Sequence, residues 1–192
     1  LVARAFNEVY QLKMSLNGEM QAAYRGEMLT KSRCGRLDQA CAYGINPVCM
    51  EFSGDDISAE KLKVGKNLYL VFADLRSKKD TKKILSDLNK AFPFAQTETD
   101  IAIQEALGRD NHIIISEASK AIADGDAPRI GELMKKAQNI FDSKIAPGCP
   151  SELLAPKLHS VLNDEKVSEY AYGGKGVGSQ GDGSVQFIAK DK

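Results

Sequence analysis

The sequence predicts an α+β fold in which helices cover an antiparallel sheet. Helical spacing of apolar residues dominates residues 1–43 and 80–163, short β-prone segments fill residues 46–75, and an alternating strand closes the chain. This order does not show the strict strand–helix alternation of a parallel sheet. A length of 192 residues is enough for one large domain or two small ones.

The opening segment, LVARAFNEVYQLKM, has the spacing of a buried helix face. Its apolar residues recur every three or four positions, at Leu1, Ala5, Val9 and Leu12. No capping residue precedes them, and the sequence has no initiator Met, so we expect the natural protein to have a further amino-terminal part. A signal peptide is the competing interpretation, but Arg4 and Glu8 interrupt the apolar core that it would need.

Two further helices are expected before the first strand. Ser15 can cap a helix through GEMQAAYRGEML, and a shorter helix is predicted over residues 36–43. Asp38 lies in the first turn of the shorter helix, where exposed N–H groups favour a carboxylate, and Gly44 is suited to end it.

Three strands are predicted next, in NPVCMEF, SAEKLKV and NLYLVFADL, with the turn residues SGDD and GK between them. Helices then return. Asp80 precedes TKKILSDLNKAF, Thr99 or Asp100 precedes IAIQEALG, and Gly125 separates HIIISEASKAIAD from a helix that has Pro128 in its first turn. Pro150 opens a last helix, SELLAPKLHSVLND.

The carboxy-terminal segment is predicted to be a strand, a glycine loop and a second strand. Six of the 16 glycines lie between Gly173 and Gly183, and the alternating sequence SVQFIAK follows them. Glycine lets backbone N–H groups approach an anion closely. The spacing GxGxxG occurs here without a following helix, so the loop taken alone fits a flexible hairpin equally well.

Composition excludes several classes of function. The 26 Lys and Arg residues balance 26 Asp and Glu residues, so no basic surface for nucleic acid is expected. No apolar run approaches the roughly 20 residues of a membrane-spanning helix, and we expect a cytoplasmic protein with no membrane partner. The two histidines are too isolated for a histidine-based metal site, and the four cysteines are expected to be reduced thiols.

Asp38 has two interpretations when taken alone. An Asp in a first helical turn commonly serves only the helix dipole. The alternative is a general base, because a fixed carboxylate can accept the proton of a hydroxyl group that attacks a phosphoryl centre. Arg33 and Arg36 could keep such a carboxylate ionised or contact a phosphate, although surface ion pairing would also explain them.

Two segments together resemble the GHMP superfamily of sugar and metabolite kinases. CGRLDQACAYG is similar to the galactokinase-type segment that contains the catalytic base, and CPSELLAPKLHSVLND with the glycine loop resembles the last helix and third motif of the family. The resemblance implies that Asp38 is the catalytic base and that three residues beside it contact the substrate: Cys34, Gly35 and Arg36. It also implies cofactor binding by five glycines: Gly174, Gly176, Gly178, Gly181 and Gly183.

The resemblance further implies ATP and Mg²⁺ as cofactors, a small-molecule alcohol as substrate, most naturally a sugar, and no metal ligand within this chain. Residues 1–66 would end a domain like ribosomal protein S5 domain 2, and residues 67–192 would form a ferredoxin-like carboxy-terminal domain. The first two family motifs would lie before Leu1, so the missing amino-terminal half becomes a partner. Asp38 and the glycine loop are expected to border one phosphoryl group.

A non-catalytic sensor or scaffold with the same fold is the alternative function. The loop KGVGSQGDG is compatible with this alternative, because it differs from the family's third motif, which is richer in glycine and one or two residues shorter. A basic cluster after the third strand could face a substrate anion, but a solvated helix start is the preferred interpretation; it comprises Arg76, Lys78, Lys79, Lys82 and Lys83. His159 is expected to pack or face solvent.

Overall fold

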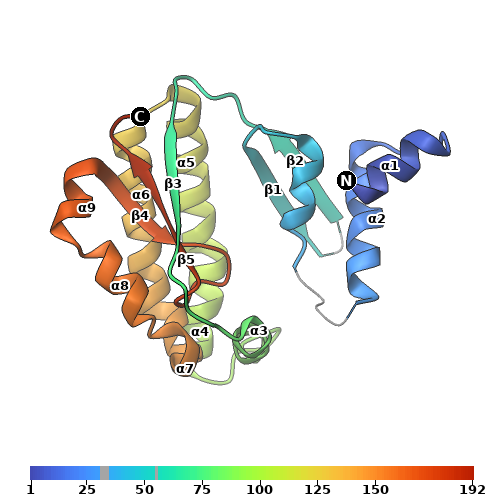
Figure 1. The fold of residues 1–192 in the computed structure, drawn as a ribbon. Helices are drawn as coiled ribbons and strands as arrows, with labels where there is room; N and C mark the ends of the chain where they lie inside the picture. The colour runs from blue at the N-terminus through green and yellow to red at the C-terminus, as the bar shows by residue number, and fades with distance from the viewer. Residues whose placement is uncertain (31–34, 55) are drawn as a thin grey trace. The chain divides into compact units, whose positions relative to one another are not determined.

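The structure is a computed structural model that describes residues 1–30, 35–54 and 56–192. The chain divides into two compact units, residues 1–63 and 64–192 (Figure 1). The first unit contains α1 (Val2–Val9), α2 (Leu16–Met28), the 3₁₀ helix η1 (Asp38–Tyr43), and an antiparallel hairpin of β1 (Val48–Ser53) and β2 (Asp56–Lys61).

Local signals set the boundaries of the elements in the first unit. The Ser15 side chain accepts a hydrogen bond of 3.1 Å from the N–H of Gly18, which confirms it as the cap of α2. Gly44 ends η1 with φ +84°, a value that side chains disfavour. The helix expected from residue 36 is shorter than predicted, because it begins at Asp38 and has the tighter 3₁₀ form.

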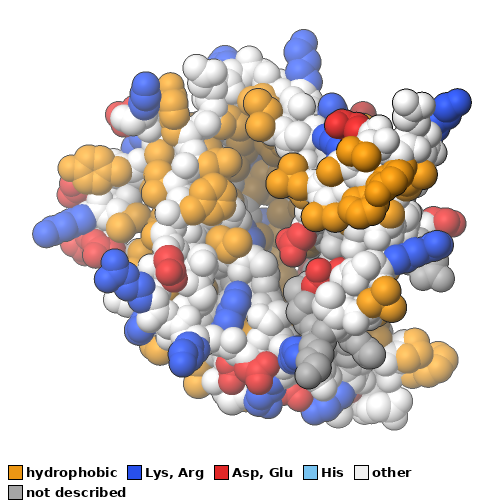
Figure 2. Space-filling view, turned by 45° about the vertical axis from the view of Figure 1, so that its right-hand side comes forward, with side chains coloured by type: hydrophobic (Ala, Val, Ile, Leu, Met, Phe, Trp, Pro, Cys, Tyr) orange, Lys and Arg blue, Asp and Glu red, His pale blue; other side chains and the backbone are white. Residues whose placement is uncertain are grey.

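The first helix is exposed on its apolar side. No residue of α1 is buried, and Val9 and Tyr10 are 73% and 65% exposed. Figure 2 shows hydrophobic side chains gathered on the surface of the molecule, and Phe6 is another exposed residue of this helix. The apolar side of α1 is therefore left uncovered by the residues that the structure describes, and its burial stays a prediction.

The second unit contains one sheet and a larger set of helices. Its strands are β3 (Tyr69–Asp74), β4 (Ala171–Gly176) and β5 (Ser184–Ala189). Its α-helices are α3 (Thr81–Asn89), α4 (Glu98–Glu105), α5 (Asn111–Asp124), α6 (Ala127–Ile140), α7 (Pro150–Leu153), α8 (Pro156–Leu162) and α9 (Glu165–Tyr170). Short π and 3₁₀ segments are η2 (Ala106–Asp110), η3 (Phe141–Ile145) and η4 (Ala146–Gly148).

The sheet has the antiparallel order β3–β5–β4 and carries helices on both faces (Figure 1). On one face, Ile188 of β5 is fully buried among residues of α5 and α6. On the other, Val185 and Phe187 pack against Leu158 of α8. Alternate residues of the central strand thus serve two cores, as the alternating SVQFIAK pattern requires.

Two helix boundaries differ from the sequence prediction. The helix of IAIQEALG begins at Glu98, because Thr97 rather than Thr99 or Asp100 is the cap and Asp100 completes a reciprocal capping box. The helix opened by Pro150 breaks at Ala155, which has φ +44° and precedes a proline that disfavours helical geometry in the residue before it. The caps Asp80 and Gly125 are confirmed.

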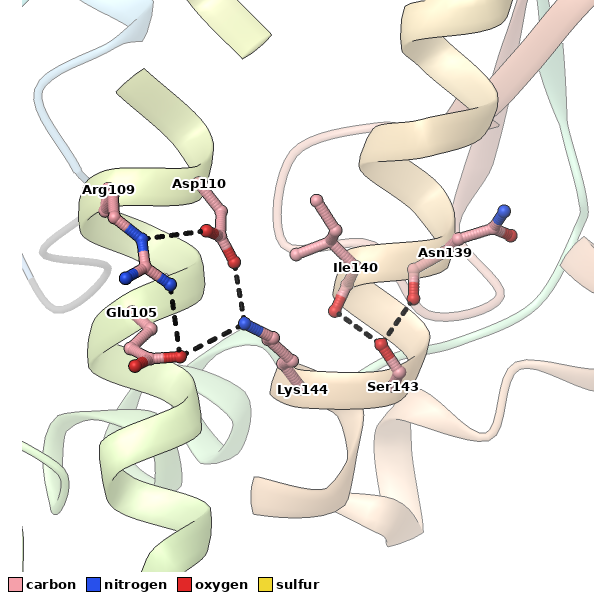
Figure 3. Close-up of polar contacts among 7 residues, drawn as sticks. All are labelled: Glu105, Arg109, Asp110, Asn139, Ile140, Ser143 and Lys144. Carbon is pink, nitrogen blue, oxygen red and sulfur yellow. Dashed lines mark hydrogen bonds and ion pairs between the residues drawn. The ribbon is translucent and has the colours of Figure 1, made fainter. Parts of the chain in front are cut away.

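An ion-pair cluster joins the two π turns of the second unit (Figure 3). Lys144 Nζ of η3 lies 2.8 Å from Asp110 Oδ2 and 3.2 Å from Glu105 Oε2, and Arg109 lies on the other side of the same carboxylates. The hydrogen bond from Lys144 lowers the pKa of Asp110, against a smaller opposing effect of burial. Within the described ranges, no helix is long and apolar enough to cross a membrane.

Candidate functional site

Asp38 is the first residue of η1 and is exposed. Its carboxylate makes no hydrogen bond or ion pair with any residue that the structure describes, and η1 has no side-chain cap. The Asp38 carboxylate is therefore available to a ligand hydroxyl group.

A polar network fixes η1 against the two first helices. The Arg4 guanidinium donates from Nη2 to the Ala42 carbonyl of η1 at 2.6 Å and from Nε to Glu19 Oε2 at 2.9 Å. Asn7 donates to the other oxygen of Glu19 at 2.9 Å. The Arg4 and Asn7 hydrogen bonds lower the pKa of Glu19, which is only 7% exposed. The network holds the backbone of the helix that carries Asp38.

The residues expected beside Asp38 are only partly described. Gly35 is exposed, and Cys34 lies outside the described residues, as does Arg33. The Arg36 guanidinium donates to Gln21 Oε1 at 2.9 Å and lies 4.5 Å from the centre of the Tyr24 ring. Stacking on an aromatic ring and a hydrogen bond fix the guanidinium against α2.

The glycine loop comprises residues 177–183, between β4 and β5. Val177 and Gln180 close a tight turn through a 3.1 Å backbone hydrogen bond, and Gly178 and Gly181 have φ of +61° and +67°. Gln180 also has a left-handed φ of +62° and is 4% exposed. Left-handed geometry in a residue other than glycine costs about 1–3 kcal/mol and is concentrated at functional sites.

Most N–H groups of the loop have no acceptor. No backbone hydrogen bond within the described part of the chain is donated by Gly178, Ser179, Gly181, Asp182 or Gly183. Gln180 Oε1 is buried and also has no partner among the described residues. Successive N–H groups without acceptors form the kind of concave surface that binds anions.

Gly174 and Gly176 lie in strand β4 rather than in the loop. The Gly176 N–H donates to Gln138 Oε1 at 2.8 Å, and a Cβ at Gly174 would lie 2.3 Å from the Phe187 ring. These two glycines allow close packing of the hairpin. Gly178, Gly181 and Gly183 are the expected cofactor-binding glycines that are placed in the loop itself.

Lys79 is a residue of this loop site that the sequence interpretation did not favour. Its ammonium group donates to the carbonyl oxygens of Gln180 at 2.7 Å and Val177 at 3.4 Å. The aliphatic part lies along Gly181 and Gly183, where a Cβ would approach it to 3.6 and 2.9 Å. Burial lowers the pKa of Lys79, and no carboxylate pairs with it among the residues the structure describes.

Asp182 anchors the far side of the loop. Its carboxylate accepts a 2.9 Å hydrogen bond from the Leu158 N–H in the first turn of α8. Ser179 Oγ lies 3.5 Å from Thr81 Oγ1 at the start of α3. The loop is thus held between α3 and α8, and the Lys79 ammonium binds two of its carbonyl oxygens. Lys83, another member of the basic cluster, instead pairs with Asp87 at 2.8 Å.

Asp38 belongs to the first unit and the glycine loop to the second. The expectation that both border one phosphoryl group stays a prediction. No group of three or more His, Cys, Asp or Glu side chains suitable for a metal ion occurs in the described ranges.

Comparison with protein-family models finds no match, and comparison with curated proteins finds none either. Solved structures do match. The chain is similar to L. major mevalonate kinase in complex with R-mevalonate, with a TM-score of 0.73 and 19% identity. It is similar to Lactococcus lactis galactokinase complexed with galactose, with a TM-score of 0.70 and 13% identity, and to homoserine kinase from Cytophaga hutchinsonii, with a TM-score of 0.62 and 19% identity.

These alignments cover 97–98% of this chain but only 52–55% of the kinases. The chain therefore has the α+β fold of about half of a GHMP kinase. All three matched structures are small-molecule kinases, and the likeness at these identities is one of fold.

Proposed function

We propose that the protein is an ATP-dependent kinase that phosphorylates a hydroxyl group of a small molecule, with a sugar as the favoured substrate class. The fold shared with three GHMP kinases supports the reaction class. The observation that carries the proposal is the exposed carboxylate of Asp38 in the segment CGRLDQACAYG, which has no partner among the residues that the structure describes. The preference for a sugar comes from the similarity of this segment to galactokinases.

In the proposed reaction, Asp38 holds the acceptor hydroxyl group and takes up its proton. The hydroxyl oxygen attacks the terminal phosphorus of ATP. The bond from this phosphorus to the bridging oxygen breaks, and ADP leaves. A carboxylate that no described residue of the chain binds needs no change of partner among them to accept the proton.

The glycine loop would bind phosphate oxygens through the N–H groups of Gly178, Gly181 and Gly183. Lys79 would add positive charge beneath them, where partial burial reduces screening by water. Fixed donors of this kind stabilise the charge that develops on the phosphoryl group.

The phosphate oxygens of ATP are hydrogen-bond acceptors, so they suit the N–H donors of this loop. Mg²⁺, which neutralises phosphate charge in such reactions, would enter with the nucleotide. The described residues provide no cluster of metal ligands.

In the whole protein, the first unit would end a domain like ribosomal protein S5 domain 2, and the second would be the ferredoxin-like carboxy-terminal domain. The enzyme would be cytoplasmic. The chain spans about half of its structural relatives, and the exposed apolar residues of α1 would pack against the amino-terminal half.

Phosphoryl transfer by the full-length protein tests the proposal. ATP and Mg²⁺ are incubated with a panel of sugars, mevalonate and homoserine, and the phosphorylated product is measured by mass spectrometry. We expect product with at least one sugar. Saturable binding of nucleotide and sugar without any product would instead support the non-catalytic sensor.

A further inference from the structure

A cavity lies in the carboxy-terminal unit, outside the glycine loop. It has a volume of about 400 Å³ and is formed by α6, α8, α9 and the strands β4 and β5. This volume is within the range of small-molecule binding sites. None of residues 177–183 lines it, and neither does Lys79. The cavity is thus separate from the groups proposed to hold the nucleotide phosphates.

Closely packed backbone forms one side of the cavity. Gly173 and Gly174 form one wall, and α6 approaches β4 so closely that a Cβ at Gly173 would lie 2.1 Å from the Gly131 carbonyl oxygen. The ring of Phe187, which is 7% exposed, also lines the cavity, with Val167 of α9 as a further apolar residue. The apolar part of the cavity can therefore cover a carbon skeleton.

One face of α6 and its π turn supplies polar groups at the spacing of successive helical turns. Lys135, Asn139 and Asp142 all line the cavity. Asp142 Oδ1 accepts a 2.8 Å hydrogen bond from Gln138 Nε2 and lies 3.5 Å from His159 Nε2 of α8. The second oxygen of Asp142 is left for another partner, and Asn139 has a free side-chain amide within the described structure.

Lys135 is the cation of the lining that has no carboxylate partner among the residues described. Asp142 accepts a hydrogen bond from Gln138 and lies 3.5 Å from His159 Nε2, a contact that is an ion pair only when the imidazole is protonated. The exposed ammonium of Lys135 is thus free to contact an anionic group at the cavity. Asp142 and the amides of Asn139 and Asn163 are suited to hydroxyl groups.

We propose that this cavity binds a small hydroxylated organic anion, with its phosphate or carboxylate near Lys135 and its hydroxyl groups near Asp142 and Asn139. A sugar monophosphate is of suitable size. The proposal does not require that the protein transfers phosphate.

Nuclear magnetic resonance of the full-length protein labelled with ¹⁵N-glycine can test this. Gly173 and Gly174 report on the cavity, whereas Gly178, Gly181 and Gly183 report on the glycine loop. Three probes share the galactose ring and differ in the charged group that they carry: a phosphate in galactose 1-phosphate, a carboxylate in galacturonate, and none in galactose. They separate a phosphate ligand from a carboxylate ligand and from a neutral sugar.

We expect saturable shifts of the Gly173 and Gly174 signals with galactose 1-phosphate, galacturonate or both, and at least about tenfold weaker binding of galactose. Lys135→Gln should weaken anion binding about tenfold or more. Lys136→Gln is the matched control, because Lys136 is the exposed neighbour that does not line the cavity. It should leave binding unchanged.

The proposal is wrong if no probe shifts Gly173 and Gly174 up to about 10 mM, if galactose binds as tightly as the anions, or if Lys135→Gln binds like the wild type. Shifts confined to the loop glycines would also overturn it, while leaving anion binding by the glycine loop intact. Failure of phosphoryl transfer in the separate activity assay would bear only on the proposed function.

Discussion

Gln138 on α6 accepts a 2.8 Å hydrogen bond from the backbone N–H of Gly176, the last residue of β4. The other end of the same amide donates to Asp142, which lines the cavity of the carboxy-terminal unit. Gln138 is only 5% exposed, and both ends of its amide are occupied. One buried side chain therefore connects a wall of the cavity with the strand end from which the glycine loop leaves.

Replacing Gln138 should destabilise the carboxy-terminal unit. Gln138→Leu keeps the volume but leaves the Gly176 N–H buried without its acceptor, which costs about 1–3 kcal/mol. Thermal unfolding should show a lower Tm. Gln186→Leu is the control, because the Gln186 side chain makes no hydrogen bond with the described residues. Equal Tm values for the two variants would show that the Gln138 bond contributes nothing.

Lys79 should contribute to nucleotide binding in the full-length protein. Hydrogen bonds to charged groups are worth about 1.5–3 kcal/mol, so Lys79→Met should weaken ATP binding by about tenfold or more. Lys78→Met removes the same charge from an exposed neighbour and should have little effect. Titration calorimetry measures both affinities.

A second measurement separates phosphate binding by Lys79 from simple support of the loop. Burial lowers the pKa of this lysine, and a bound polyphosphate would favour the charged ammonium and raise the pKa. Resonances of ¹³C-labelled lysine should therefore titrate at higher pH with ADP present. An unchanged Lys79 pKa would limit the residue to a structural role.

Local sequence signals predicted most elements because they act within one turn. Ser15 and Asp80 cap their helices through N–H groups three residues ahead, and Gly125 ends α5 in the left-handed conformation that favours glycine. The loop role of Lys79 could not be derived in this way. Its partner Gln180 is 101 positions away, and only the pairing of β3 with β5 brings the two segments together.

Only part of the candidate site could be predicted from the sequence. Asp38 was identified from the segment in which it lies, but only the structure shows that its carboxylate has no partner among the described residues. The family resemblance implied cofactor binding by Gly176, but the N–H of this residue is already bonded to Gln138. His159 was expected to pack or face solvent, yet its pairing with Asp142 depends on the break at Ala155 that sets the direction of α8.

The pair of Asp110 and Lys144 should make stability sensitive to acid. The pKa of Asp110 is lowered in the folded state, so its stabilising effect is present above the unfolded-state pKa of about 3.9 and is lost as the pH falls through the folded-state value. Asp110→Asn should lower Tm at pH 7, and the difference from wild type should narrow below about pH 4 and close once the pH is below the folded-state pKa. Asp191→Asn, at the exposed carboxy terminus, should match wild type at both pH values. A difference between Asp110→Asn and wild type that persisted in acid would point to lost packing rather than lost charge.

Asp38→Asn decides between the catalytic and structural roles of the proposed base. The variant keeps the size of the side chain but cannot accept a proton, and general base catalysis typically contributes about 10²- to 10⁴-fold. In the full-length protein, kcat should fall at least about 100-fold, with little change in nucleotide affinity. Because the carboxylate has no partner among the described residues, Tm should stay close to that of wild type. Asp56→Asn, at an exposed position of the same unit, should keep full activity. Near-normal single-turnover transfer by Asp38→Asn would contradict the catalytic role and leave a ligand-binding protein as the better interpretation.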